Sequence, residues 1–240
     1  MTAFFFIAIH LLQLFTGIDH SLSTNSYLEG RGFGGVASVV SNGGGHIKQI
    51  YSDAIITIKG SYSGNAGRIC SKVNVATSME ECWYDGVITN SGRDSGGIVD
   101  VILGCKVELS HCLFSGEINC TWDYSGSRTG GFVGRIVNED AQLSLTDCLS
   151  HGTITSGHLT YTGVVLGTAM ADTTLVCKDT YAARGEYAAI GNSGFNGTMQ
   201  SLPLEIVADN LVGYKAYQWT NLDFSNYWSV IENDTPILTC

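Results

Sequence analysis

The residues of this chain with the clearest capacity for chemistry are carboxylic acids and arginines near its middle. Two carboxyl groups that converge within about 5 to 10 Å can cleave a glycosidic bond as acid and base. The candidates, with two arginines suited to hold an acidic sugar, are Asp94, Asp100, Glu117, Asp123, Arg93 and Arg128. The repeat described below puts Asp100 and Glu117 on different faces, and Asp94 and Asp123 in loops, where solvated acids are usual. We therefore assign no catalytic residue.

A second set of polar residues recurs one position before an Ala or Gly, and it consists of Asp53, Asp85, Ser115 and His151. Acids in such a column are conceivable metal ligands, but these residue types are also favoured in turns, which is the interpretation we adopt. The histidines share no spacing that would assemble a ligand set. No H-E-x-x-H, G-x-S-x-G or Walker-type motif is present, so we expect neither a metal site nor a cofactor.

Aromatic residues in expected loops are better candidates for binding. A flat ring on a rigid surface can stack on a sugar ring or anchor a protein partner. The candidate ligand-binding residues are Trp122 and Tyr124 in the longest loop, Tyr62 and Tyr161 before glycine corners, and Asp123 and Arg128 beside them. The alternative, that these rings fold back on their own coil, stays open.

A repeat in the sequence supplies the scaffold on which these residues would be placed. Its first mark falls at Gly35, Gly67, Gly97, Gly131 and Gly163, in steps of 32, 30, 34 and 32 residues. Its second mark follows 15 or 17 residues later, at Ile50, Cys82, Cys112, Cys148 and Thr180. Two marks that keep one period over five copies indicate a repeat architecture.

Each copy is typical of short strands joined by glycine corners. The chain holds 30 Gly and only 2 Pro, and its β-branched residues suit a pleated surface. In the third copy we expect strands at 97–103, 106–113 and 117–121. Three short strands per copy without a helical period predict an all-β fold. We expect a single-stranded, parallel, right-handed β-helix or β-solenoid of about five coils.

The repeat also predicts stacked columns of interior residues, because a single coil cannot bury its own inner face. The expected columns are Val36, Ile69, Ile98, Phe132 and Val164, then Val75, Leu109, Leu145 and Cys177, and then Ile56, Ile88, Ile118 and Ile154. Strict alternation from Leu109 would turn Cys112 outward, whereas a bulge just before Cys112 would turn it inward. We predict that it points inward, because Ile50 occupies the same position in the first copy.

Eight cysteines are spread along the chain without any C-x-x-C pair, which gives no support to a zinc ribbon or a thioredoxin-like site. On neighbouring strands about 4.8 Å apart their Cα atoms would be close enough for a disulfide, but parallel Cβ vectors suit one poorly. We favour small buried hydrophobic side chains and leave pairing open.

Three segments follow from the period. Residues 1–28 are apolar and are either a degenerate signal peptide or a cap over the first coil. The run is too short to span a bilayer comfortably. Residues 29–192 form the repeat array. Residues 193–240 break the period with a dense apolar set, which predicts a C-terminal cap packed on the last coil.

The motif Gly-Gly-[Ile/Phe/Val]-Val-Gly, followed by [Asn/Asp]-Cys-x-x-x-Gly-x-[Ile/Val], resembles the GLUG-type repeats of bacterial secreted and surface-anchored proteins. These include regions attached to IgA-specific metallopeptidases of Gram-positive bacteria. The best copy is residues 130–134, and residues 221–238 resemble the segment that commonly ends such arrays. The first copies depart from the motif at Ala66 and Arg68. The resemblance implies a parallel β-solenoid on an extracellular protein and transfers no catalytic residue.

The charge balance narrows the partners. With 12 Lys and Arg against 22 Asp and Glu, the net charge of -10 argues against nucleic acid and against an anionic membrane surface. We expect a non-catalytic extracellular module for adhesion, ligand binding or spacing at a microbial surface, with a glycan or a host or cell-surface protein as partner. The alternatives are a polysaccharide-cleaving β-helix enzyme and a structural solenoid that associates end to end.

Overall fold

The computed structural model describes most of the repeat array and the C-terminal segment. The described residues are 20–21, 25–28, 33–34, 37–41, 45–58, 65–67, 69–121, 126–138, 140–157, 159–170, 172–191 and 198–239. The apolar residues 1–19 lie outside these ranges, and so do four of the candidate binding residues, Tyr62, Trp122, Asp123 and Tyr124.

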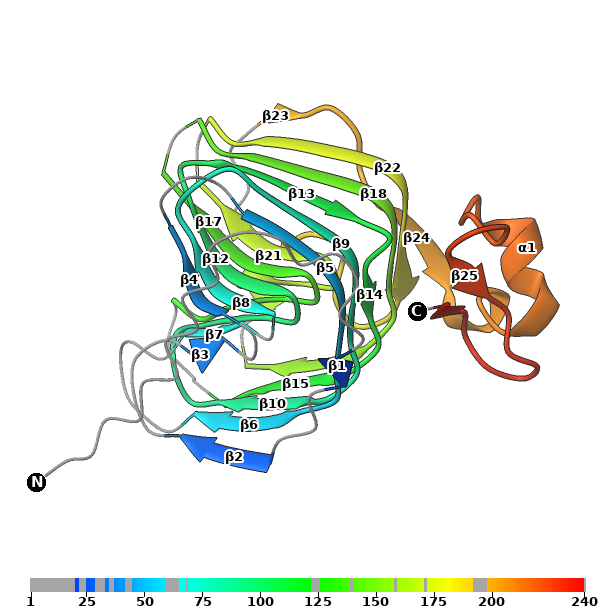
Figure 1. Cartoon of the computed structure of the whole chain (residues 1–240), viewed down its shortest axis with the longest axis horizontal. Coiled ribbons are helices and arrows are strands. Elements are labelled where there is room, and N and C mark those ends of the chain that lie inside the picture. Colours follow the sequence, from blue (N-terminus) through cyan, green and yellow to red (C-terminus); the bar gives the residue numbers. More distant parts are fainter. Residues whose placement is uncertain are drawn as a thin grey trace, which may run out of the picture.

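The fold is a parallel β-solenoid, as predicted, with four strand positions in each coil (Figure 1). One full coil consists of β7 (Asn65–Gly67), β8 (Cys70–Val73), β9 (Thr77–Tyr84) and β10 (Val87–Asn90). Counterparts from successive coils stack into four sheets, which we call sheets C, D, A and B in that order along the coil. The prediction had three strands per coil because it left out the sheet C strand: its first strand, 97–103, begins after β11 (Asp94–Gly96) and covers the sheet D strand β12 (Val99–Leu103).

The strands of the four sheets have the following bounds. Sheet A contains β1 (His20–Ser21), β5 (Gly45–Ser52), β9, β13 (Lys106–Ser110), β14 (Leu113–Phe114), β18 (Gln142–Ser150), β22 (Thr174–Arg184), β23 (Thr198–Met199) and β24 (Leu204–Val207). Sheet B contains β2 (Asn25–Leu28), β6 (Ile55–Ile58), β10, β15 (Glu117–Cys120) and β19 (Thr153–Ser156). Sheet C contains β3 (Phe33–Gly34), β7, β11 (Asp94–Gly96), β16 (Arg128–Gly130) and β20 (Thr162–Gly163). Sheet D contains β4 (Ala37–Val40), β8, β12 (Val99–Leu103), β17 (Val133–Val137) and β21 (Leu166–Ala169).

The solenoid has about four turns, slightly fewer than the predicted five. The last glycine mark, Gly163, opens a coil that remains incomplete. Within the described residues, β22 of that coil is followed by β23 and β24 of the same sheet instead of by a sheet B strand.

The register confirms one predicted column and shifts two others. Ile56, Ile88, Ile118 and Ile154 are direct partners in sheet B, as predicted. In sheet C, Gly67 and Gly163 align with Gly96 and Gly130, so the glycine marks of these copies were placed one residue off. The residue beside Phe132 in the core is consequently Val165, and Met79 replaces Val75 next to Leu109. Spacing alone cannot resolve a shift of one residue where some copies have two adjacent glycines and others one.

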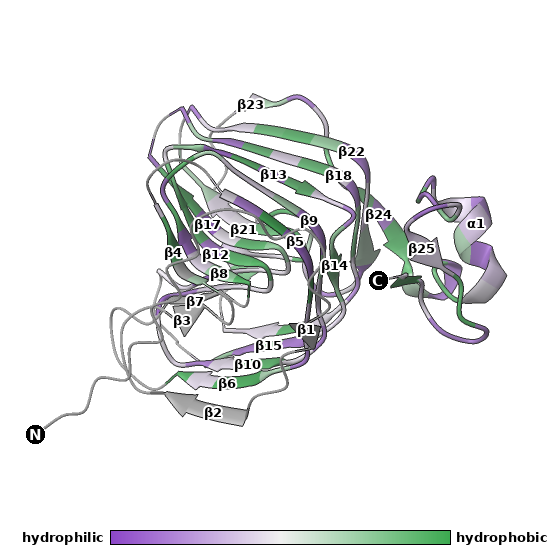
Figure 2. Ribbon diagram, viewed as in Figure 1, coloured by the Kyte–Doolittle hydropathy of each residue, from purple (hydrophilic) through white to green (hydrophobic). Residues whose placement is uncertain are grey.

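A recurring left-handed residue turns the cysteines inward. The residues before the second mark are Gln49, Glu81, His111, Asp147 and Asp179, with φ values of 58°, 53°, 51°, 53° and 46°. One such residue per coil reverses the alternation of side chains along the strand, as a bulge does. Cys82, Cys112 and Cys148 are completely buried in the core, which confirms the inward prediction. Figure 2 shows the same pattern, with hydrophobic residues along the strands and hydrophilic residues at many turns.

The C-terminal segment packs against the side of the solenoid as well as continuing its last coil. β23 and β24 pair with β22. The chain then forms η2 (Ala208–Asn210), η3 (Gly213–Lys215), α1 (Ala216–Trp219) and the antiparallel pair β25 (Trp228–Ser229) and β26 (Ile237–Leu238). This part lies beside sheet A (Figure 1, orange and red). Its core residues pack on Leu113, Leu149 and Tyr181 of three successive coils, so its contacts reach beyond the last coil. Among the described residues, no helix is both long and apolar enough to cross a bilayer.

Candidate functional site

Two of the candidate binding residues, Tyr161 and Arg128, lie together on the solenoid. The guanidinium carbon of Arg128 is 5.7 Å from the centroid of the Tyr161 ring, within range of a cation–π contact. Arg128 also donates to the carbonyl oxygen of Gly126 and lies 3.5 Å from Asp94. Both side chains thus contact the solenoid itself, in agreement with the alternative that the rings fold back on their own coil.

The acids considered for glycan cleavage are not brought into a shared site. Asp94 belongs to strand β11 and not to a loop, and only 2% of it is exposed. Burial raises the pKa of Asp94, although the neighbouring arginines act in the opposite direction. Asp100 is completely buried in sheet D, and Glu117 is exposed on sheet B, where it accepts a hydrogen bond from Asn119. The arrangement of these three acids gives no support to an acid–base pair.

The column of Asp85, Ser115 and His151 forms hydrogen bonds between neighbouring coils and to the C-terminal segment. The Ser115 hydroxyl donates to Asp85 at 2.7 Å and accepts from the indole N–H of Trp83 at 2.7 Å. His151 Nε2 lies 3.2 Å from the hydroxyl of Thr235. In the described part of the chain, no three His, Cys, Asp or Glu side chains are arranged to hold a metal ion.

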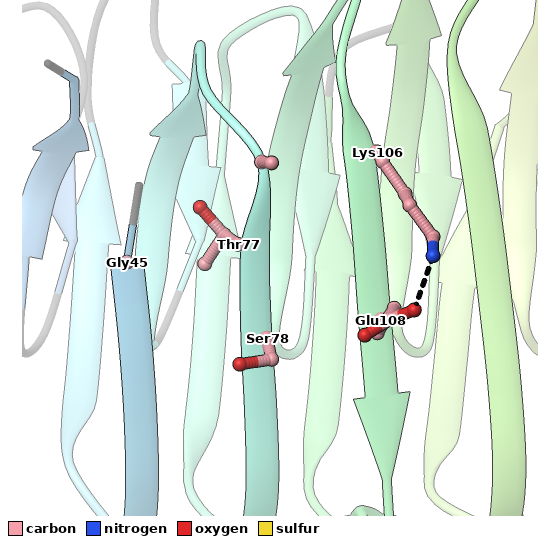
Figure 3. A pocket seen from close by; sticks show the side chains of 6 residues that line it. Gly45, Thr77, Ser78, Lys106 and Glu108 are labelled. Carbon is pink, nitrogen blue, oxygen red and sulfur yellow. Dashed lines mark ion pairs between the residues drawn. The ribbon is translucent and has the colours of Figure 1, made fainter. Parts of the chain in front are cut away.

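A shallow pocket of about 280 Å³ lies on the outer face of sheet A (Figure 3). It is lined by Gly45, Ala76, Thr77, Ser78, Lys106 and Glu108. Lys106 and Glu108 form an ion pair at 2.6 Å along one strand, so the two charged side chains of the pocket neutralise each other. None of the lining residues is aromatic, and binding pockets are usually lined by apolar and aromatic side chains.

The strongest candidate is an array of aromatic rings on the C-terminal segment. Tyr214 is 77% exposed and Tyr217 is 50% exposed, and their rings stack at 6.1 Å and 17°. The Tyr217 ring also lies 4.2 Å from the ring of Phe224. We call Tyr214, Tyr217 and Phe224 the aromatic platform. Trp219, on the same short helix, is 56% exposed.

Local sequence explains why these rings face outward. Gly213 has a φ of 59°, a conformation that glycine adopts without steric cost, and the chain turns there into η3 and α1. The residues that anchor this turn, Leu211, Ala216 and Leu222, are buried. Because Ala216 is the buried residue of α1 and the flanking Leu211 and Leu222 are buried too, Tyr214 and Tyr217 are left facing solvent.

Polar contacts fix the segment that carries the platform. Asp147 accepts hydrogen bonds from the indole N–H of Trp228 at 2.7 Å and from the backbone N–H of Asp223 at 3.0 Å. The ring of His111 stacks on Tyr227 at 3.5 Å, and its Nε2 is 3.7 Å from Asp147. We call His111, Asp147, Tyr227 and Trp228 the docking cluster. Two of its members, His111 and Asp147, are left-handed residues of the solenoid.

Asp147 and Asp223 have pKa values shifted in opposite directions, a pattern seen in acid–base pairs. Burial raises the pKa of Asp147, while a hydrogen bond from Asn226 lowers that of Asp223. Asp147 is only 5% exposed, however, and both of its oxygens already accept hydrogen bonds. Asp223 accepts from the backbone of Ser225 and Asn226. These acids therefore hold the structure together and leave no free oxygen on Asp147 for a substrate.

The platform residues were not predicted from the sequence. The apolar set of residues 193–240 was assigned to a cap, and of its aromatic rings Trp228 does lie in the core, with Phe224 and Tyr227 packed against it. The signal available was the pair Tyr214 and Tyr217 at a spacing of three, which places both on one face of a helical turn.

Comparison with protein-family models, with curated proteins and with solved structures found no match. The resemblance to GLUG-type repeats accordingly stays a prediction.

Proposed function

We propose that this protein is a non-catalytic binding module in which a rigid solenoid presents the aromatic platform to a neutral glycan. The observation that carries the proposal is the exposure of Tyr214 and Tyr217 in one contiguous ring array. Large aromatic side chains that stay exposed on a well-packed support are unusual on surfaces without a ligand or partner. The docking cluster supports this role because it immobilises the segment, so little entropy is lost on binding.

Charge and composition favour a neutral sugar over other ligands. The net charge of -10 on the whole molecule opposes the approach of acidic polymers. Ring faces suit the apolar faces of sugar rings, while the exposed Lys215 and Gln218 beside them offer hydrogen bonds to hydroxyl groups. A location outside the cell or at its surface belongs to the same proposal and is supported by the resemblance of the repeats.

The test is glycan-array screening of the full chain, followed by titration calorimetry with the best neutral ligand. Replacing Tyr214 and Tyr217 by Ala should weaken binding by about tenfold for each ring, because stacking and buried area are lost. Tyr161→Ala is the matched control, since it removes a ring just before the sheet C strand β20, away from the C-terminal segment. Unchanged binding in the double variant would refute the platform, and binding lost in Tyr161→Ala would move the site to the coil loops.

A second candidate function is end-to-end self-association, which the last strands of sheet A favour. Within the described residues, β24 pairs only with β22, so one edge of β24 remains unpaired. Exposed apolar side chains near that edge are Met199, Leu202, Leu204 and Val207, each at least 46% exposed. Light scattering should show mass rising with concentration, and Leu204→Lys should suppress the rise. A strict monomer at every concentration would remove this candidate.

A further inference from the structure

Three arginines gather where sheets C and D meet, on the side of the solenoid away from the C-terminal segment (Figure 1). Arg128 lies on β16 directly beside Asp94 of β11. Arg135 lies on β17, and Arg93 immediately precedes Asp94 in the chain. Different segments thus bring a quarter of the 12 Lys and Arg residues of the protein to one place.

The contacts within this cluster leave guanidinium donors unused. Arg128 and Arg135 approach the two oxygens of Asp94 at 3.5 and 3.7 Å. Both distances exceed the roughly 2.7 to 2.9 Å of a charge-assisted hydrogen bond. The ion pair of Arg135 with Asp94 joins one guanidinium nitrogen to one carboxylate oxygen. A guanidinium group has five N–H donors, more than this one pair occupies.

The charges of the cluster do not balance. Besides Asp94, the buried carboxylate of Asp100 also acts on Arg135. Among the described residues, three guanidinium groups therefore face two carboxylates, which leaves an excess positive charge in a chain that is strongly acidic overall. Burial lowers the pKa of Arg135, and the like charges of Arg128 and Arg93 lower it further. A bound anion would relieve this repulsion.

Access is provided from one side. Arg93 is exposed, whereas the side chains of Arg128 and Arg135 are only 16% and 17% exposed. The two half-buried groups are held by strands and by the Tyr161 ring, so their planar forks are preorganised. An incoming anion would contact the exposed Arg93 together with the exposed part of Arg135.

We propose that Arg93, Arg128 and Arg135 form a binding site for a small oxyanion, a carboxylate or a sulfate- or phosphate-type group. Paired N–H donors of guanidinium match the oxygens of such groups in spacing and charge. This site is separate from the aromatic platform and does not depend on the proposed glycan.

The experiment is titration calorimetry of the full chain with sodium sulfate, sodium phosphate and sodium acetate at constant ionic strength in chloride. We expect saturable binding of at least one anion, weakened at least about tenfold in Arg93→Gln. Arg184→Gln is the control, because it removes an exposed arginine of sheet A and should leave binding unchanged. Arg135→Lys keeps the charge but loses the fork, and it should weaken binding while the fold is retained.

The three titrations also identify the chemistry of the ligand. Tighter binding of acetate would indicate a planar carboxylate, and tighter binding of sulfate or phosphate would indicate a tetrahedral group. No saturable heat with any of the three anions would overturn the proposal. Equal weakening by Arg93→Gln and Arg184→Gln would overturn it as well, since the effect would then be one of net charge alone.

Discussion

At the scale of single residues, the cysteines show how burial controls reactivity. The seven described cysteines are free thiols, and five of them in the core cluster are at most 8% exposed. Burial raises the pKa of Cys70 and of Cys177 to about 12, and it also raises the pKa of Cys112 and Cys148 well above the ordinary value. Because the thiolate is the reactive form, these side chains behave as small core hydrophobes.

Chemical labelling should follow exposure. We expect iodoacetamide at pH 8 to modify Cys105, which is half-buried, well before Cys112 or Cys148 in the native protein. Mass spectrometry of peptides from native and urea-unfolded samples measures the order. Cys105→Ser should remove the fast-reacting described site, and equally fast labelling of Cys112 would contradict the core position.

The carboxylate of Asp147 should matter for stability because it receives the indole N–H of the buried Trp228. In Asp147→Asn, an amide nitrogen replaces one of the two carboxylate oxygens. That nitrogen cannot accept the hydrogen bond that the replaced oxygen now receives. We expect a loss of about 1 to 3 kcal/mol in the free energy of unfolding, measured by urea denaturation at pH 7. Asp209→Asn, at an exposed position of the same segment, should change stability by less than about 0.5 kcal/mol.

The same residue should give a pH dependence of defined sign. Burial raises the pKa of Asp147 above its ordinary value of 3.8, so the folded chain binds this proton more tightly than the unfolded chain. The resulting stability is fully present below pH 3.8 and is lost as pH rises through the raised pKa. The stability difference, wild type minus Asp147→Asn, should therefore decline over that window. A difference that grows with pH would contradict the assignment.

At the scale of elements, the chain bends at a left-handed residue in β5, β9, β18 and β22 and between β13 and β14 of sheet A, and each such bend lies at the same place in the coil. A non-glycine residue in that region costs roughly 1 kcal/mol or more, which the protein tolerates because the bend turns the next side chain into the core. Long or polar residues fill all five positions, and none is β-branched.

Glu81→Val and Glu80→Val give a matched test of this bend. Both glutamates pair with Lys48, at 3.0 and 3.1 Å, so each variant loses one ion pair, and Glu81→Val also loses the hydrogen bond that Glu81 accepts from Gln49. Only Glu81 has a positive φ, where a β-branched side chain is strained. We expect Glu81→Val to cost about 1 to 3 kcal/mol more than Glu80→Val in chemical denaturation. Equal costs would show that the bend tolerates branching.

The glycine pair between sheets C and D is a second element-scale feature, because it lets two coils approach closely. A Cβ added to Gly97 would lie 2.1 Å from the carbonyl oxygen of Gly131 and 2.5 Å from the Phe114 ring. Gly97→Ala should destabilise by at least about 1 to 3 kcal/mol, since backbone and core must shift. Gly185→Ala, where no atom lies within 4 Å, should be neutral in the same thermal unfolding assay.

At the scale of the whole molecule, two hydrophobic cores share sheet A as a common wall. The interior core runs through the coils, and a smaller core joins the outer face of the sheet to the C-terminal segment. On β18, Leu143 faces the first core and Leu149 the second. The solenoid should therefore stay folded when the second core is lost. The aromatic platform should then no longer be held against sheet A.

Leu143→Lys and Leu149→Lys should separate these two cores. An unpaired buried charge costs more than about 3 kcal/mol in either place. We expect Leu149→Lys to release the C-terminal segment, seen as a red shift of tryptophan fluorescence, while the far-ultraviolet circular dichroism of the strands persists. Leu143→Lys should abolish both signals. Simultaneous loss in both variants would indicate a single cooperative unit.

The sequence by itself determined the solenoid and the identity of its repeating positions. Isoleucines at one phase, glycines at another and a cysteine after three of the five bends are local patterns, and parallel stacking converts such a period directly into columns. The inward cysteines were also predictable, because the bulge that turns them needs only neighbouring residues.

Only the tertiary structure decided where the C-terminal segment lies and which side chains remain exposed on it. The contacts of Asp147 with Asp223 and Trp228 join residues 76 and 81 positions apart, and no period links such positions. Periodicity also cannot tell a buried aromatic residue from an exposed one, so Trp228 and Tyr214 looked alike in the sequence. Their different surroundings arise from packing on sheet A, which buries the indole and leaves the phenol ring in solvent.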